Sequence, residues 1–410
     1  MNGTCRHCDA PLKHSLCDLG MSPPSNAYLT LAQLQQMEKF YPLHAYVCGT
    51  CFLVQLQEFE SPEQIFSDYA YFSSYSQTWL DHARAYTDYM IARFGFGKES
   101  HVVEIASNDG YLLQYFKRKD VPVLGIEPAV NVAKVAQEAG IPTLTKFFGV
   151  KTATELAADG KQADLLLGNN VLAHVPDLND FVRGLKIALK AGGVITMEFP
   201  HLLRLMRENQ FDTIYHEHFS YFSFLTVEHV FAHHGLRLFD VERIPTHGGS
   251  LRIFAAHAED TQPLAHERVA LLKREETAAG LADLRAYREF SEQVKRTKRL
   301  LLEFLIKARQ SGKTIVGYGA PAKGNTLLNY CGIRGDFIEY TVDLSPHKQG
   351  KFLPGTHIPI FHPDKVRETR PDYLLVLPWN LKDEIVGQMA HIREWGGQFI
   401  LPIPEVRVVQ

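Results

Sequence analysis

The stretch Val102-Val103-Glu104-Ile105-Ala106-Ser107-Asn108-Asp109-Gly110 decides the fold of this chain. It begins as a short apolar run typical of a buried strand, and a polar turn that ends in glycine follows before a helical pattern. Ligands of open α/β sheets bind at the carboxyl ends of such strands. The stretch therefore predicts a ligand-binding turn at the edge of a parallel sheet.

Strand-like and helix-like segments alternate around this stretch. We expect strands at 101–106, 122–126, 163–168 and 194–198, helices at 111–119, 131–139 and 178–189, and a closing strand pair at 236–243 and 250–256. Such alternation predicts a parallel sheet with helices on both faces.

The flanking segments differ from this central unit. The tyrosine-rich segment 69–76 leads into a helix near 79–90, and the charged helical region 262–310 is either a connector or a dimer helix. Strands at 313–318, 338–342 and 373–377 predict a second, smaller α/β unit. We therefore expect three domains, at 1–65, 66–260 and 261–410.

Composition excludes several classes of function. With a formal net charge of -3 and no basic stripe, nucleic acid is not an expected partner. The start of the chain carries cysteines and charges instead of an apolar leader, and no apolar segment approaches the length of a membrane span. The sequence therefore predicts a cytoplasmic protein.

Four of the six cysteines form two CxxC pairs, Cys5 with Cys8 and Cys48 with Cys51. Four thiolates suit a tetrahedral zinc ion with no open position, so we expect a structural metal in a module that has little core of its own. Unrelated thiols and redox chemistry are the alternatives.

The predicted strand ends also carry the candidate cofactor ligands. Glu127 ends the second strand, the position from which an acid holds a ribose diol. Asn169 and Asn170 end a later strand and could line the cofactor or cap a helix instead. The full candidate set is Glu104, Ala106, Ser107, Asn108, Asp109, Gly110, Glu127, Asn169 and Asn170.

These motifs resemble a class I S-adenosylmethionine methyltransferase, although the turn lacks the usual GxGxG. With the CxxC pairs in front and Tyr215-His216-Glu217-His218-Phe219 behind, the chain resembles the nucleotide-sugar C-methyltransferases that act at C-3 in branched deoxysugar biosynthesis. The resemblance implies S-adenosylmethionine as cofactor, structural zinc, a Rossmann-like methyltransferase domain between a zinc module and a smaller Rossmann-like α/β domain, and a nucleotide-linked keto-deoxysugar as substrate.

The resemblance also implies roles for individual residues. His218 is the base at C-3, Glu217 orients it or binds the sugar, and Tyr215 lies near the keto oxygen. His174 matches a second active-site histidine, and Tyr71 or Tyr75 belongs to a lid. Extended backbone would put His216 and His218 on one face, a bent backbone leaves the geometry open, and a second zinc at these histidines is a weaker alternative.

A glycine-rich loop in the last unit, Gly317 to Asn325, precedes a predicted helix, where backbone N–H groups favour a phosphate. A dinucleotide would also fit. The family places the sugar's diphosphate here, which implies nucleotide ligands among Ala322, Lys323, Gly324, Asn325 and Asp343.

Two other functions compete with methyl transfer. One is an NAD(P)-dependent oxidoreductase of sugar nucleotides, although the 106–110 turn lacks pyrophosphate glycines. The other is a zinc-bearing scaffold that keeps the fold without turnover. The sequence leaves open whether the nucleotide is thymidine or guanosine diphosphate and whether the protein is a monomer or a homodimer.

Overall fold

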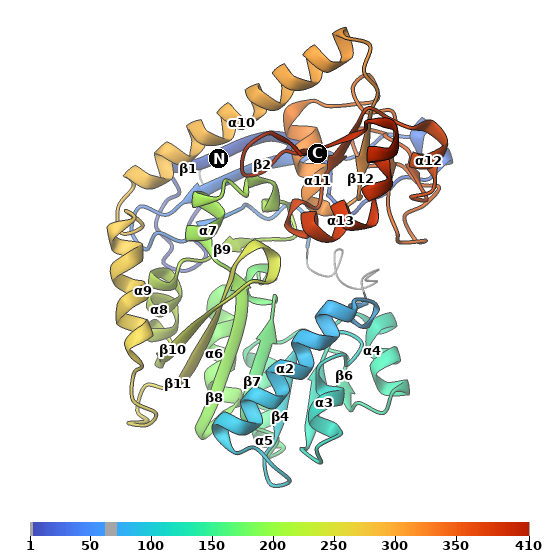
Figure 1. Ribbon diagram of the computed structural model, residues 1–410. Coiled ribbons are helices and arrows are strands. Elements are labelled where there is room, and N and C mark those ends of the chain that lie inside the picture. The colour runs from blue at the N-terminus through green and yellow to red at the C-terminus, as the bar shows by residue number, and fades with distance from the viewer. Residues whose placement is uncertain (1–2, 62–71, 410) are drawn as a thin grey trace.

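The computed structural model describes residues 3–61 and 72–409, and three sheets are present within these ranges (Figure 1). The predicted α/β class is confirmed. Tyr71 and the start of the tyrosine-rich segment, residues 69–71, lie outside the described residues.

The central sheet contains seven strands in the order β10-β11-β8-β7-β4-β5-β6. From β8 to β6 the strands are parallel, whereas β11 pairs antiparallel with β8 and with β10, which confirms the predicted closing pair. The strands are β4 (Val102–Ile105), β5 (Val123–Ile126), β6 (Thr143–Leu144), β7 (Ala163–Asn169), β8 (Leu189–Pro200), β10 (Leu236–Ile244) and β11 (Ser250–His257).

Helices cover both faces of the central sheet, as predicted. One apolar cluster joins the sheet to α2, α3 and α4, and the other joins it to α5, α6, α8 and α9. The bounds are α2 (Gln77–Phe94), α3 (Leu113–Lys117), α4 (Val130–Glu138), α5 (Val150–Ala158), α6 (Leu178–Ala188), α7 (Leu202–Arg207), α8 (Phe224–His233) and α9 (Glu267–Ala278). Short 3-10 turns are η2 (Ser73–Tyr75), η3 (Leu172–His174), η4 (Phe211–Thr213) and η5 (Thr246–Gly248).

The N-terminal sheet is antiparallel, and its last strand comes from far along the chain. Its order is β1 (His14–Ser22), β2 (Tyr41–Val47), β3 (Val54–Gln55) and β9 (Ser220–Tyr221), with the turn η1 (Leu31–Gln35) between β1 and β2. Because β3 pairs with β9, this sheet does not follow a division of the chain at residue 65.

The C-terminal sheet has the order β14-β13-β12-β15-β16-β17. The strands are β12 (Ile315–Tyr318), β13 (Thr341–Val342), β14 (Ile360–Phe361), β15 (Tyr373–Val376), β16 (Gln398–Leu401) and β17 (Arg407–Val409). Its helices are α11 (Ala322–Cys331), α12 (Lys365–Thr369) and α13 (Lys382–Gln388), with turns η6 (Trp379–Leu381) and η7 (Ala390–Trp395). The strand predicted over 338–342 is shorter than expected, because Ile338 N–H closes a turn onto Arg334 O at 3.0 Å.

The long helix α10 (Arg285–Gln310) connects the two halves of the molecule (Figure 1). Its apolar stripe, which includes Tyr287, Phe290 and Leu301, belongs to a core shared with the N-terminal and C-terminal sheets. No helix within the described residues combines the length and apolarity that a membrane span requires.

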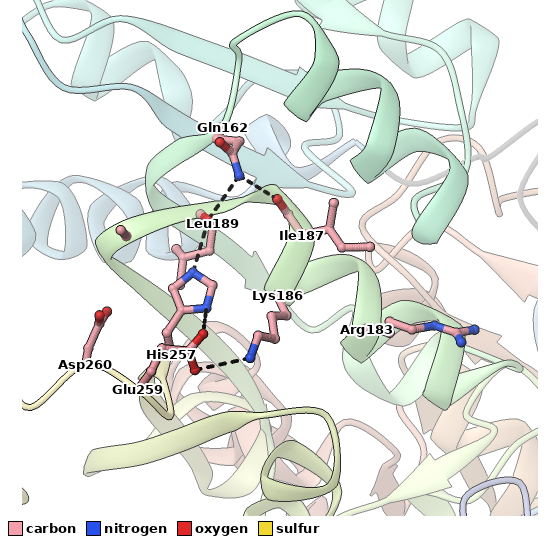
Figure 2. A pocket seen from close by; sticks show the side chains of 9 residues that line it. Gln162, Arg183, Lys186, Ile187, Leu189, His257, Glu259 and Asp260 are labelled. Atoms are coloured by element: carbon pink, nitrogen blue, oxygen red, sulfur yellow. Dashed lines mark hydrogen bonds and ion pairs between the residues drawn. The ribbon is translucent and has the colours of Figure 1, made fainter.

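The carboxyl ends of the parallel strands face the N-terminal sheet and the C-terminal unit (Figure 1). The pocket drawn in Figure 2 lies at the opposite end of the sheet. Its volume is about 460 Å³, and its lining includes Leu189, the first residue of β8. The candidate ligands therefore lie on the side that faces the other two units.

Candidate active site

The turn after β4 has three residues with left-handed backbone. Ala106 and Asn108 have φ values of 53° and 50°, and Gly110 has 78°. The Asn108 N–H donates to Glu127 Oε2 at 2.9 Å, and the Ala129 N–H donates to Glu127 Oε1 at 2.9 Å. Glu127 is therefore held at the end of β5, and a second lone pair on each oxygen can still accept from a diol.

Buried polar atoms without partners gather at these strand ends. Within the described ranges they include Glu104 Oε2, Ser107 Oγ, Asp109 Oδ1 and both amide atoms of Asn169. Burying such atoms without hydrogen bonds costs about 1–3 kcal/mol each, so they fit a site that a polar cofactor completes. Burial and the nearby carboxylates of Asp109 and Glu127 hold the pKa of Glu104 well above its usual range.

The close approach of this turn to β5 also explains why residue 125 is a glycine. A Cβ added to Gly125 would lie 2.4 Å from Ser107 Oγ. The turn therefore packs against β5 at a distance that only glycine permits.

The turn η2 lies on this cofactor turn. The Ser73 N–H donates to Asn108 Oδ1 at 2.9 Å, and the Ser74 N–H donates to Asp109 Oδ2 at 3.0 Å. Tyr75, one of the two candidate lid tyrosines, is 75% exposed. The segment that carries it is thus fixed to the cofactor turn while the ring itself points into solvent.

Helix α2 supplies site residues that the sequence did not predict. Trp79 stacks on His82 with ring centroids 5.0 Å apart and on Tyr111 at 6.0 Å. His82 Nε2 lies 2.8 Å from Glu198 Oε2, and Arg252 donates to Glu198 Oε1 at 2.7 Å. Burial opposes ionisation of Glu198, but these two partners outweigh it and lower the pKa.

The motif at 215–218 is bent, not extended. The His218 N–H donates to Tyr215 O at 2.9 Å, which closes a turn and separates His216 from His218. The His216 ring instead packs near Tyr41 and Phe59, with centroid distances of 5.9 and 6.4 Å. Of the two histidines, only His218 therefore lies with the other active-site candidates.

Hydrogen bonds assign the protonation of His218. Nδ1 lies 3.1 Å from the Thr213 carbonyl oxygen, which can only accept, so Nδ1 carries the proton. Nε2 then accepts from the Tyr215 hydroxyl at 2.8 Å. Burial, reinforced by His174 and Lys323, holds the pKa of His218 well below its usual range. The imidazole is therefore a neutral base paired with a phenol.

His174 lies beside this pair. Its ring centroid is 4.7 Å from that of His218, and its Nδ1 donates to Glu217 O at 2.7 Å. Burial lowers the pKa of His174 to about 4. The Glu217 carboxylate does not contact His218; it accepts from Asn26 Nδ2 at 2.6 Å.

His247, in the turn η5, reaches the same region from between β10 and β11. Its Nε2 accepts from Asn170 Nδ2 at 3.0 Å, and its backbone is left-handed with φ 54°. Burial, followed by the positive charge of Lys323, lowers the pKa of His247 to about 4. The glycine-containing turn 247–249 thus approaches the cofactor strands.

Lys323 faces this site from the C-terminal unit. Its Nζ donates to Asn380 Oδ1 at 2.7 Å and lies 4.6 Å from the centroid of the Trp379 ring. The Trp379 N–H donates to the buried Asp212 at 2.7 Å. Burial raises the pKa of Asp212 to about 7, against the opposing effect of Lys323.

Of the other candidate nucleotide ligands, Asp343 and Asn325 have structural partners. Asp343 accepts from the backbone N–H groups of Ala320 at 2.7 Å and Ser345 at 2.8 Å. Asn325 Nδ2 donates to Ser25 O at 2.7 Å. No side chain caps the start of α11, at Ala322, Lys323 and Gly324, so its first N–H groups suit an anion.

The four cysteine thiols converge as the spacing predicted. Cys5, Cys8, Cys48 and Cys51 place their sulfurs within 4.8 Å of one another. The contacts of 3.5 Å between Cys5 and Cys51 and between Cys8 and Cys48 approach the edge of ~3.8 Å expected for a ZnS₄ tetrahedron with Zn–S bonds of ~2.3 Å. The donor set therefore fits structural zinc.

Three family models match the chain. They are described as "Putative zinc binding domain" at residues 5–66, "Methyltransferase domain" at 79–241 and "C-methyltransferase C-terminal domain" at 245–404. C-methyltransferase NovU of Streptomyces niveus is 38% identical over 375 residues, which cover 91% of this chain and 88% of that protein. The chain belongs to the C-methyltransferase family.

Other matches are more distant. Ubiquinone biosynthesis O-methyltransferase of Methylobacterium sp. is 33% identical over 97 residues, which are 23% of this chain and 38% of that protein. Magnesium protoporphyrin IX methyltransferase from Synechocystis with bound SAM aligns at a TM-score of 0.33 with 13% identity, over 43% of this chain and 79% of that one. The PH0226 protein from Pyrococcus horikoshii aligns at 0.39 with 14% identity, over 48% and 99%.

Family membership gives the coarse activity. The protein is an S-adenosylmethionine-dependent C-methyltransferase that carries structural zinc and acts on a small molecule. This favours methyl transfer over the oxidoreductase and scaffold alternatives. Bound S-adenosylmethionine supplies an electrophilic methyl group, so the protein's own residues must bind and activate a carbon nucleophile.

Proposed function

We propose that this enzyme methylates C-3 of a nucleotide-linked 4-keto-6-deoxysugar, with thymidine diphosphate as the expected nucleotide. The observation that carries the proposal is the neutral His218 paired with Tyr215 and adjacent to His174, opposite Lys323. A carbon beside a ketone becomes nucleophilic when a base removes its proton, and a neutral imidazole suits this step near pH 7.

The proposed mechanism divides the work among the converging residues. The C-3 proton passes to His218 Nε2. It passes either directly or through the Tyr215 hydroxyl, which donates a hydrogen bond to this nitrogen. The negative charge that develops on the keto oxygen is stabilised by donors at the site, with the Tyr215 hydroxyl as the candidate, because the one N–H of neutral His174 is already donated to Glu217 O. C-3 would then form the bond to the methyl group as the bond from that methyl group to the sulfonium sulfur breaks, which would release S-adenosylhomocysteine.

The nucleotide would bind at the start of α11. Uncapped N–H groups at Ala322, Lys323 and Gly324, together with the Lys323 ammonium, suit a diphosphate. Asp343 and Asn325 would support this loop through their backbone contacts. The three units would thus share one site, with the sugar between the cofactor turn and α11.

Mass spectrometry tests the proposal. Purified enzyme, S-adenosylmethionine and dTDP-4-keto-6-deoxyglucose should give a product one methyl group heavier, and His218→Ala should lower the rate by about 10²–10⁴-fold. In D₂O without S-adenosylmethionine, deuterium should enter at C-3 with wild type but not with His218→Ala.

His216→Gln is the matched control two residues away. Because His216 packs against Tyr41 and Phe59, this variant should retain wild-type deuterium exchange even if its stability falls. Binding of S-adenosylmethionine without any methyl gain on thymidine or guanosine diphosphate sugars would count against the proposed substrate.

A further inference from the structure

Loop 23–28 of the N-terminal module joins the two sides of the proposed acceptor site. Ser25 O accepts from Asn325 on α11, and the Tyr28 hydroxyl donates to Ala320 O at 2.5 Å, just before α11. Asn26, between them, donates to the Glu217 carboxylate at 2.6 Å. A single short loop thus connects the candidate nucleotide loop to the turn that carries His218.

Glu217 is a buried carboxylate without a cation. Its exposed fraction is 8%, and the hydrogen bond recorded for its carboxylate among the described residues comes from Asn26 to Oε1. Glu60 and Tyr28 are the titratable groups that act on it, and neither supplies positive charge near neutral pH. The second oxygen of this carboxylate can accept from a further donor.

The position of Glu217 points to the source of that donor. Its own carbonyl oxygen accepts from His174, and the next residue is His218. Asn26 is solvent-exposed although it bonds to a buried group, as expected for a residue at the edge of a substrate site. A hydroxyl or ammonium group of the acceptor could reach the second carboxylate oxygen.

We propose that Asn26 is a positioning residue that aims the Glu217 carboxylate at a hydroxyl or ammonium group of the methyl acceptor, so that the zinc module selects acceptors by this substituent. The inference rests on the proposed function for the identity of the acceptor. Asn26, which precedes the second CxxC pair, would then take part in substrate recognition and not only in folding.

The test compares Asn26→Ala with Thr30→Ala, a control in the same segment whose side chain, within the described part of the chain, bonds to Gln33. Asn26→Ala should raise the KM for the nucleotide sugar by about tenfold or more with a smaller change in kcat, because a hydrogen bond to a charged group is lost. Zinc content and the Kd for S-adenosylmethionine should match wild type. Thr30→Ala should change none of these values.

A second readout needs no substrate. The Asn26 hydrogen bond opposes the effect of burial, which raises the pKa of Glu217. The pKa of Glu217, followed by ¹³C NMR and assigned with Glu217→Gln, should therefore rise in Asn26→Ala and stay at the wild-type value in Thr30→Ala.

The two readouts separate the possible failures. If wild type gains no methyl group on any nucleotide sugar, the proposed function fails and the Glu217 titration alone decides the inference. An unshifted pKa overturns it, and a raised pKa supports it. If wild type is active, an unchanged KM in Asn26→Ala overturns the inference whatever the titration shows.

Discussion

At the scale of single residues, the site depends on histidines that the protein keeps neutral. His174 and His247 both have a pKa lowered to about 4, and that of His218 is held well below its usual range. Neutral imidazoles can accept protons or donate hydrogen bonds without bringing positive charge next to a sulfonium cofactor. Burial is the main cause in each case.

Acid should destabilise the protein because of these groups. For His174 the folded pKa of about 4 lies below the ordinary value of 6.5, so the folded state binds fewer protons between these pH values. Its contribution to stability is complete above pH 6.5, is lost as the pH falls to about 4, and does not change further below that. Urea unfolding between pH 7 and 4 should show this slope.

His174→Gln provides the check, since it removes the titrating group. The dependence of unfolding free energy on pH should become shallower by up to about one proton in this interval. An unchanged slope would mean that His174 is not held neutral in the folded state.

At the scale of elements, the loop between β4 and α3 is shaped by its contact with β5. The alternating sequence predicts these strands, but the 2.4 Å approach of a Gly125 Cβ to Ser107 follows from how the two strands pair. The paired strand ends then bring Glu104, Asn108 and Glu127 together, although Glu127 is about twenty residues from the turn.

Gly125→Ala should therefore weaken cofactor binding. The added methyl group must displace the Ser107 side chain, so we expect the Kd for S-adenosylmethionine to rise about tenfold or more, equivalent to at least ~1.4 kcal/mol. Isothermal titration measures this directly. Gly97→Ala is the control, because its Cβ would meet no atom within 4 Å, and its Kd should equal that of wild type.

At the scale of the whole molecule, all three units contribute to one site. The zinc module pairs β3 with β9 immediately after His218, and Arg6, within the first CxxC pair, donates to Pro176 O in the segment after His174. The C-terminal unit brings Lys323 and Trp379 to Asp212. Zinc binding and nucleotide binding should consequently both affect catalysis.

Removal of zinc should abolish methyl transfer. A chelator, or Cys48→Ser, should release the metal, loosen the β3–β9 pairing and lower the rate by about 100-fold or more, while the Kd for S-adenosylmethionine changes little. Metal analysis and methyl transfer assays on the same sample measure both effects, and zinc added back after chelation should restore activity. An apoprotein with wild-type turnover would show that the module does not support the His218 segment.

Lys323→Met should alter both affinity and pH dependence. The Lys323 charge lowers the pKa of His218, so its removal should raise that pKa and move the acid limb of kcat/KM to higher pH. The KM for the nucleotide sugar should also rise because the diphosphate loses a cation.

Lys313→Met is the control on the same unit. Lys313 pairs with Asp372 on the surface, so this variant should leave both the KM and the acid limb unchanged. If the acid limb of kcat/KM stays at the same pH in Lys323→Met, then Lys323 does not influence the pKa of the catalytic base.

The sequence by itself determined the class of fold, the four thiol ligands, the glycine-rich loop before α11 and the central strands β4, β5, β7, β8, β10 and β11, but not the short strand β6. Periodicity, turn chemistry and short ligand spacings are local properties, so they can be seen without the fold. The resemblance to C-methyltransferases followed from the same motifs, and the match to NovU supports it.

Only the tertiary structure decided how distant segments meet. In the folded protein the turn 215–218 is bent, and His218 pairs with Tyr215. The Glu217 carboxylate contacts Asn26, and Asp343 accepts from a backbone N–H group. The fold also completes the N-terminal sheet with β9. These contacts join residues as far apart as Ser25 and Asn325. No local pattern encodes them, because they arise when segments from all three parts of the chain pack their apolar side chains into a shared core.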